Sequence, residues 1–322
     1  AKDGANGNDL PIDLAFGLGK SLGLILVAYA TWLAAFVILP FAGWTAWLLW
    51  LAIGAAGWAT LGIRPATLWQ SVLAHRRAIL AGEAIFLAVF LALCWVRAKT
   101  PDATFRYDVG RRDYDYSASE KFTNLALMTG LNRERDFPPR DTWLAGYPLN
   151  YYYFGQFEWT MVCKMTGMPP RIGFTIGQAA LFALIALNAF SLVLLLTRKL
   201  WAAVVGAYAL PIMGSPYGFI QLFTQGFRRY EYWEASRIVE GTVIDGNIAG
   251  PITEFPFFTF LVGDFHAHGI SFHSYLLALA VVVMLGLGDG SIGGWTARTK
   301  WTRWTKRISM SSIVGVFVLG LL

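Results

Sequence analysis

Two short runs of this chain gather the residue types that could do chemistry, and both lie among long apolar stretches. The first run reads DFPPRDTWLAGYPLNYYYFG. Its Asp141 could act as a general base, and the neighbouring Arg140 could bind an anionic group. Its three tyrosines, Tyr151, Tyr152 and Tyr153, could stack on a sugar or a prenyl chain. The alternatives without a catalytic or binding role are an exposed ion pair for Arg140 and Asp141, and an aromatic belt at a membrane surface for the tyrosines.

The second run reads EFPFFTFLVGDFHAH and begins at Glu254, a candidate substrate-binding residue. If the segment is extended, Asp264, His266 and His268 share one face, a spacing that could close on a divalent metal. If it is helical, Asp264 and His268 still share a face, so a metal or an anion could bind in either conformation. Histidines at a membrane interface could instead cap the next helix. A divalent metal is therefore the one candidate cofactor.

Three further sites carry charge in unusual surroundings. Arg237 follows the acidic and aromatic stretch YEYWEAS and could clamp a phosphate, although a loop arginine often has a structural partner. Glu120 and Lys121 could be an exposed ion pair or part of a site. Glu158 and Lys164 interrupt the apolar stretch 154–168, and because charges facing lipid are costly, we expect them to point into a cavity or to snorkel.

The elements that position these residues follow from composition. Of 322 residues, 56% are hydrophobic, 14% are charged and 16% are aromatic, which is typical of an integral membrane protein with aromatic belts. Runs of about 20 apolar residues predict spans near 15–39, 41–63, 78–97, 172–197, 200–223 and 269–288. A seventh begins near Ile308. The fold class is therefore all-α and polytopic, with about seven spans.

Basic residues in the short connections predict the orientation. Segments 64–77, 198–199 and 289–307 are basic and should face the cytoplasm. The long segments 98–149 and 224–268 alternate with them and should form two loops on the outer face. We expect one membrane domain over 1–322. Because the chain lacks an initial Met and stops inside an apolar run, we also expect it to be a fragment of a longer chain.

Two local patterns refine this picture. Residues 120–131 have apolar positions at helical spacing, which suits a helix lying on the membrane surface. Pro211 and Pro216 should break the span 200–223 at a position that lines protein or a watery cavity.

The charge and the cysteines exclude other classes of protein. The net charge of +6 is explained by the cytoplasmic connections, and no basic patch interleaved with aromatics lies elsewhere, so we predict no nucleic-acid partner. Cys94 and Cys163 both lie in apolar stretches and do not indicate a disulfide or a zinc site.

Taken together, the motifs resemble a known family. FPPRDTWLAG, NYYYFG, ASRIV and EFPFF…GDFHAH closely resemble the YYY-domain family of multi-spanning bacterial and archaeal membrane proteins. The resemblance also includes LPID near the start, RAKTPD and SEK. The family tends to carry a proline where this chain has Phe122. A prokaryotic cytoplasmic membrane is therefore the expected location.

That family has an architecture similar to GT-C-like glycosyltransferases, which are membrane enzymes that use polyprenyl-phosphate sugars. In those enzymes a long first outer loop carries a catalytic carboxylate before a surface helix. The resemblance implies that Glu120 is the first candidate base and Asp141 the second. Lys121, Arg140 or Arg237, or a metal held by the Asp264 run, would then offset charge on the departing phosphate.

The leading hypothesis is therefore transfer of a sugar from a polyprenyl-phosphate donor, or another lipid, to an acceptor on the outer face. Two alternatives remain. The chain could be a non-catalytic structural subunit of a larger membrane complex, with membrane-protein partners on its aromatic loops. It could also be a lipid or solute transporter, which would place ionisable groups at mid-membrane.

Overall fold

The apolar runs of the sequence form helices, because a backbone surrounded by lipid must satisfy its hydrogen bonds internally. The computed structural model describes residues 12–61, 64–99, 106–108, 113–115, 119–213, 220–221, 223–224, 226, 242–244, 247–249, 255–263 and 265–288. The helices are α1 (Ile12–Val37), α2 (Gly43–Leu61), α3 (Pro65–Lys99), α4 (Ser119–Arg133), α5 (Phe154–Thr166), α6 (Pro170–Thr197), α7 (Leu200–Ile212), α10 (Pro256–Val262) and α11 (Ala267–Gly288).

Two small antiparallel hairpins accompany the helices. Strand β1 (Arg106–Asp108) pairs with β2 (Asp113–Asp115), and β3 (Thr242–Ile244) pairs with β4 (Asn247–Ala249). Both hairpins belong to the long segments predicted as outer loops, and the bundle itself is helical, as predicted.

Four helices among the described residues are long and apolar enough to cross a membrane. They are Phe16–Val37 of α1, all of α3, all of α6, and Ala267–Met284 of α11. The expected span at 41–63 is present as α2, an apolar helix of 19 residues that is not one of these four. The expected seventh span, from Ile308, lies outside the described residues.

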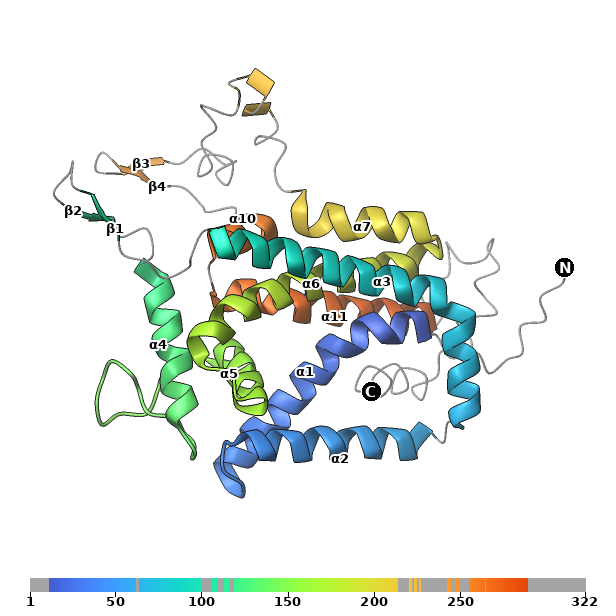
Figure 1. Cartoon of the computed structure of the whole chain (residues 1–322), viewed down its shortest axis with the longest axis horizontal. Helices are drawn as coiled ribbons and strands as arrows, with labels where there is room; N and C mark the ends of the chain where they lie inside the picture. Colours follow the sequence, from blue (N-terminus) through green and yellow to red (C-terminus); the bar gives the residue numbers. More distant parts are fainter. Residues whose placement is uncertain are drawn as a thin grey trace, which may run out of the picture.

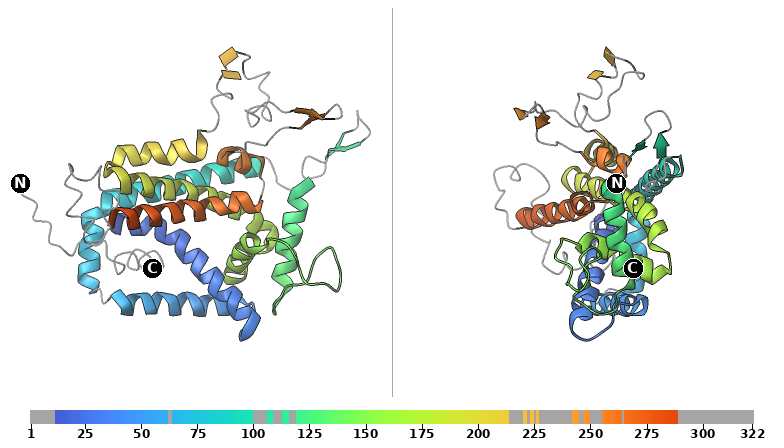
Figure 2. Two further views of the ribbon diagram at one scale, coloured as in Figure 1. Left: turned by 180° about the vertical axis from the view of Figure 1, so that it is seen from behind. Right: turned by 90° about the vertical axis from the view of Figure 1, so that its left-hand side faces the viewer.

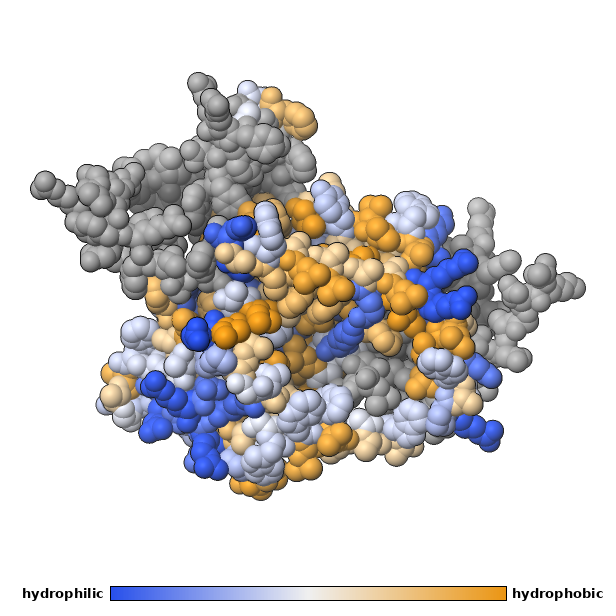
Figure 3. All heavy atoms as spheres, in the orientation of Figure 1, coloured by the Kyte–Doolittle hydropathy of each residue, from blue (hydrophilic) through white to orange (hydrophobic). Residues whose placement is uncertain are grey.

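Helix α6 occupies the centre of the bundle. It packs against α1, α3, α7 and α11, and 83% of its most apolar window is buried in protein. Figure 1 shows α3, α7 and α11 running beside α6, with α1 crossing obliquely toward α2. Figure 2 shows the same arrangement from behind and from one end. On the face shown in Figure 3, apolar residues cover most of the middle of the bundle, and hydrophilic residues gather mainly toward its two ends.

Two helices differ from the predicted spans. Helix α3 has 35 residues, about 52 Å of helix against roughly 30 Å of bilayer core, so most of the basic segment 64–77 is its first part and not a loop. Its apolar part matches the predicted span 78–97. Helix α7 ends at Ile212, one residue after Pro211, in agreement with the predicted break; residues 214–219 lie outside the described part.

The direction of the helices decides where the long segments lie. Helices α1 and α3 run one way through the bundle, and α6 and α11 run the other way (Figure 1). The end of α3 therefore lies with the start of α11, and α10 and the start of α4 lie at the same end. Both predicted loops thus leave the bundle at one end, as their alternation in the sequence predicts.

Candidate functional site

The end of the bundle where the long segments meet is held by a buried arginine. Arg97, in the last turn of α3, is only 4% exposed, and its Nη2 donates a hydrogen bond to the carbonyl oxygen of Leu261 in α10. A charge buried at a helix end needs a partner, because an unpaired charge in the interior is very costly. This contact fastens the end of one spanning helix to the segment that precedes another.

A buried amide makes the second connection at this end. Gln156 of α5 is fully buried, and its Nε2 donates to Asn124 Oδ1 of α4 at 3.0 Å and to the carbonyl oxygen of Phe265 at 3.1 Å. One side chain therefore joins three segments that are far apart in sequence. The first half of α4 and the residues just before α11 are brought together by it.

These contacts bring together some of the predicted site residues. Glu120 lies in the first turn of α4, one turn before Asn124, and the structure describes its backbone alone. Lys121 beside it is half-buried. The rings of His266 and His268 stack with centroids 5.6 Å apart, directly after Phe265. The candidate base and the candidate metal run therefore converge on the same end of the bundle.

Three predicted residues, Arg237, Glu254 and Asp264, lie outside the described residues. Among the residues that are described, no group of three or more His, Cys, Asp or Glu side chains could hold a metal ion. The predicted metal set includes Asp264, so that set remains a prediction. His266 and His268 supply imidazole nitrogens of the kind that zinc and similar ions prefer.

The loop before α5 holds the other predicted residues, and most of their polar groups have local partners. Arg140 pairs with Glu134 through Nε and Oε1 at 3.0 Å. Asp141 Oδ1 accepts hydrogen bonds from the backbone N–H groups of Trp143 at 2.7 Å and Leu144 at 3.0 Å. This is the geometry of an Asx turn, in which the carboxylate shapes the loop.

The same loop is remote from the start of α4. A Cβ added to Gly130 would lie 2.1 Å from Thr142 Cγ2, so Thr142 rests against the second half of α4. Ten helical residues separate Gly130 from Glu120, which is about 15 Å along the axis. Asp141, next to Thr142, is therefore set apart from Glu120, and the structure does not bring the two candidate carboxylates together.

The three tyrosines have two different environments. Tyr151 and Tyr152 stack with ring centroids 4.1 Å apart and are 41% and 64% exposed. Tyr153 is half-buried, and its hydroxyl accepts a hydrogen bond from Trp32 Nε1 at 3.1 Å. Burial raises the pKa of the Tyr153 hydroxyl, and the bond from Trp32 opposes that rise. Tyr153 thus anchors the loop to α1, whereas the rings of Tyr151 and Tyr152 are exposed.

Lys164 does point inward, as predicted for a charge in this apolar stretch. Its Nζ donates to the carbonyl oxygens of Phe41 and Glu134, each at 2.9 Å, and lies 4.5 Å from the centre of the Phe41 ring. Burial lowers the pKa of Lys164, and repulsion from Arg135 lowers it further, whereas the carboxylate of Glu134 opposes the change. The ammonium group joins α5 to the α1–α2 turn.

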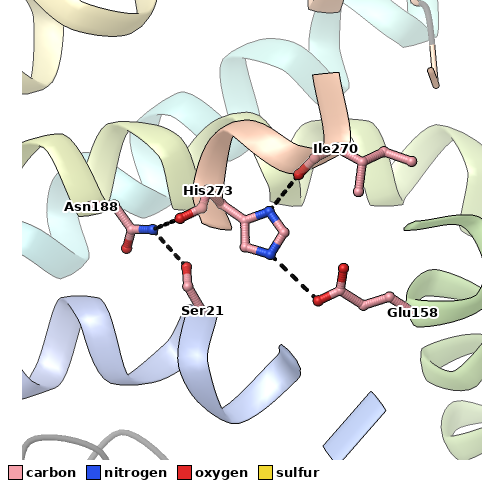
Figure 4. Close-up of polar contacts among 5 residues, drawn as sticks. All are labelled: Ser21, Glu158, Asn188, Ile270 and His273. Atoms are coloured by element: carbon pink, nitrogen blue, oxygen red, sulfur yellow. Dashed lines mark hydrogen bonds and ion pairs between the residues drawn. The ribbon is translucent and has the colours of Figure 1, made fainter. Parts of the chain in front are cut away.

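Glu158 also points inward, and its partner was not predicted. Glu158 is 2% exposed, and its Oε1 lies 3.4 Å from Nε2 of the fully buried His273 in α11 (Figure 4). His273 lies inside a predicted span, with no motif around it. The one available signal was an ionisable side chain within an apolar run, which by itself suggests function in a membrane protein.

Comparison with known proteins gives one result. The uncharacterized membrane protein family DUF2298 matches residues 26–319, and the chain therefore belongs to that family. No curated protein and no solved structure matches the chain significantly. The family match and the apolar helices agree on an integral membrane protein.

Proposed function

We propose that this member of the DUF2298 membrane protein family is a GT-C-like glycosyltransferase that moves a sugar from a polyprenyl-phosphate donor to an acceptor hydroxyl. The observation that carries the proposal is the bridge made by Gln156, which brings the helix that begins beside Glu120 to the segment that contains His266 and His268. A carboxylate and a cluster of nitrogen donors at one end of a membrane bundle suit a donor with a polar head and an apolar tail. We place this end at the outer face of a prokaryotic cytoplasmic membrane.

In the proposed reaction, Glu120 accepts the proton of the acceptor hydroxyl as its oxygen bonds to the anomeric carbon of the sugar. The bond from that carbon to the phosphate oxygen breaks, and polyprenyl phosphate leaves with the electron pair. Lys121 offsets the charge that develops on the phosphate. A divalent metal would be held by His266 and His268 with Asp264, and it would add positive charge at the same place.

The loop before α5 has a supporting role in this proposal. The stacked rings of Tyr151 and Tyr152 offer a flat apolar surface to a sugar or a prenyl chain. Asp141 and Arg140 hold the shape of the loop through the Asx turn and the pair with Glu134. Arg237 and Glu254 are proposed as substrate-binding residues from the sequence motifs alone.

The test is transfer of a labelled sugar from polyprenyl-phosphate donors by the full-length protein in nanodiscs. We expect Glu120→Gln to keep the assembled protein and its donor binding but to lose about 100-fold or more of the turnover, as expected for a missing general base. Asp141→Asn is the matched control, because the amide oxygen can still accept the turn hydrogen bonds, and we expect a much smaller loss. Full turnover by Glu120→Gln would exclude the proposed base, and complete assembly with no transfer from any donor would favour a structural subunit.

A transporter is the second candidate, and one observation favours it. Glu158 and His273 form an ionisable pair buried among spanning helices, which is where transporters carry such groups. Flux of a labelled solute or lipid into proteoliposomes, lost in Glu158→Gln and kept in Glu120→Gln, would support transport over glycosyl transfer.

A further inference from the structure

The hydrogen bonds of His273 fix where one of its protons lies. Its Nδ1 is 2.6 Å from the carbonyl oxygen of Ile270, and a carbonyl can only accept, so Nδ1 carries a hydrogen (Figure 4). The other ring nitrogen, Nε2, is therefore the atom that can gain or lose a proton. It faces the carboxyl group of Glu158 at 3.4 Å, an ion-pair separation.

One proton between these groups satisfies both of them. It can reside on Nε2, which gives an imidazolium beside a carboxylate, or on Glu158, which gives a carboxylic acid beside a neutral ring. Removing it leaves a carboxylate that is 2% exposed beside an uncharged imidazole. An ionised carboxylate in such surroundings is strongly disfavoured unless a cation approaches or the site opens.

The helices that pack against α5 do not bring another described cation to the pair. Helix α2 has no titratable side chain, and the one such side chain on α6 is the exposed Arg171. On α1, Lys20 is paired with Glu83 of α3. The remaining titratable residues on these helices are Asp13 and the exposed Tyr29 on α1, Glu120, the half-buried Lys121 and the exposed Arg133 on α4, and the exposed His268 and Tyr275 on α11. On α5 itself, Cys163 is buried and Lys164 is bound to two carbonyls.

The opposite side of His273 is fastened to the centre of the bundle. Asn188 of α6 donates through Nδ2 to the carbonyl oxygen of His273 at 3.0 Å and to Ser21 Oγ of α1 at 2.8 Å (Figure 4). These groups are fully buried and neutral. This part of α11 is therefore held to α1 and α6 whether or not the pair holds its proton. The proton affects the other contact, the one between α11 and α5.

We propose that Glu158 and His273 form a proton-binding site inside the membrane-embedded bundle, and that the bound proton holds α5 against α11. This proton-binding site can exist whether the protein transfers a sugar or transports a solute. Loss of the proton leaves an uncompensated charge between the two helices and favours their separation.

The site has a direct connection to the candidate functional site. Gln156 precedes Glu158 on α5 by two residues, and it donates to the carbonyl of Phe265, just before α11. Helices α5 and α11 are therefore joined at two neighbouring levels, one by a neutral hydrogen bond and one by the proton. Separation at Glu158 would strain the bridge at Gln156, so protonation should regulate the packing near Glu120 and His266.

The first experiment counts the proton directly. The full chain is prepared in nanodiscs with ¹⁵N-histidine and ¹³C-glutamate for solid-state NMR at pH 7, with His273→Gln and Glu158→Gln used to assign the two signals. We expect either a protonated Nε2 or a protonated Glu158 carboxyl group. A deprotonated Nε2 beside an ionised Glu158 would overturn the proposal. The protonation state is read in the wild-type protein, and the variants serve only to assign its signals.

The second experiment tests the coupling to packing. Hydrogen exchange of the α5 amides, corrected for the intrinsic effect of pH, should rise by about tenfold or more when the wild-type pair loses its proton at high pH, equivalent to about one pKa unit of coupling. Glu158→Gln should remove that dependence. Glu134→Gln, the same chemical change in a carboxylate that pairs with Arg140 instead, should keep it. An α5 exchange rate with the same pH dependence in all three proteins would refute the coupling.

Discussion

Replacing Gln156 with leucine tests whether one buried amide holds the candidate functional site together. Leucine has nearly the same volume but no donor, so the variant loses the hydrogen bonds to Asn124 Oδ1 and to the carbonyl oxygen of Phe265. A buried acceptor left without a partner costs about 1–3 kcal/mol. The Phe265 carbonyl is fixed by the backbone and bears that cost, whereas the side chain of Asn124 can turn.

The net change in the free energy of local opening combines this cost with one compensating gain. Gln156 Oε1 is itself buried without a partner, and its removal offsets roughly 1 kcal/mol of the loss. The expected weakening of the junction is therefore about 2 kcal/mol, close to a 30-fold increase in local opening. It should concentrate in α4 and in the residues just before α11.

Hydrogen exchange followed by mass spectrometry, with the protein in nanodiscs, measures this opening. Thr166→Val is the control, because its hydroxyl is exposed and bonds only to the preceding turn of α5. We expect that variant to exchange as the wild type does in both segments. Unchanged exchange of the α4 amides in Gln156→Leu would refute the bridge as the element that joins the two segments.

Three other substitutions test the packing around α5. Lys164→Met removes two hydrogen bonds to carbonyls and should lower the stability by about 2 kcal/mol, measured by thermal unfolding in detergent. Because burial lowers the pKa of Lys164 in the folded state, the stability of the wild type should rise with pH between that lowered pKa and 10.5. The variant should lack this rise. Gly43→Ala places a Cβ 2.2 Å from the carbonyl oxygen of Lys164, a backbone atom, and should lower the melting temperature by an amount equivalent to about 1–3 kcal/mol. Tyr153→Phe removes the acceptor of the Trp32 hydrogen bond and should cost about 1 kcal/mol, with a change in tryptophan fluorescence; unchanged fluorescence would contradict that contact.

The spans that follow simple apolar runs were predicted well. The expected span 172–197 is Pro170–Thr197, and the expected 269–288 is Ala267–Gly288. Proline at the start of α6 and the Arg-Lys pair after it mark its bounds in the sequence. A helix is also present over the expected residues 120–131, within α4. Local composition and spacing carry this information.

The details that define the candidate site depend on contacts between distant residues. Glu158 and His273 are 115 positions apart, and Gln156 joins residues from two other segments. No local pattern encodes those pairings, because packing of the helices creates them. The family resemblance implied Glu120 and Asp141 as the first and second candidate bases, but the loop that holds Asp141 rests against the second half of α4. Charge counting likewise marked 64–77 as a connection, although charge does not prevent a helix from continuing.

The position of α6 has a consequence for how the protein enters the membrane. It contains the most apolar window of the four spanning helices, yet that window is 83% buried and has little contact with lipid in the folded protein. Its composition therefore suits insertion, when a new helix meets lipid alone, more than it suits the finished bundle. Polar substitutions on α6 that find partners in the folded state should be tolerated after assembly, and their cost should appear as failed insertion during synthesis.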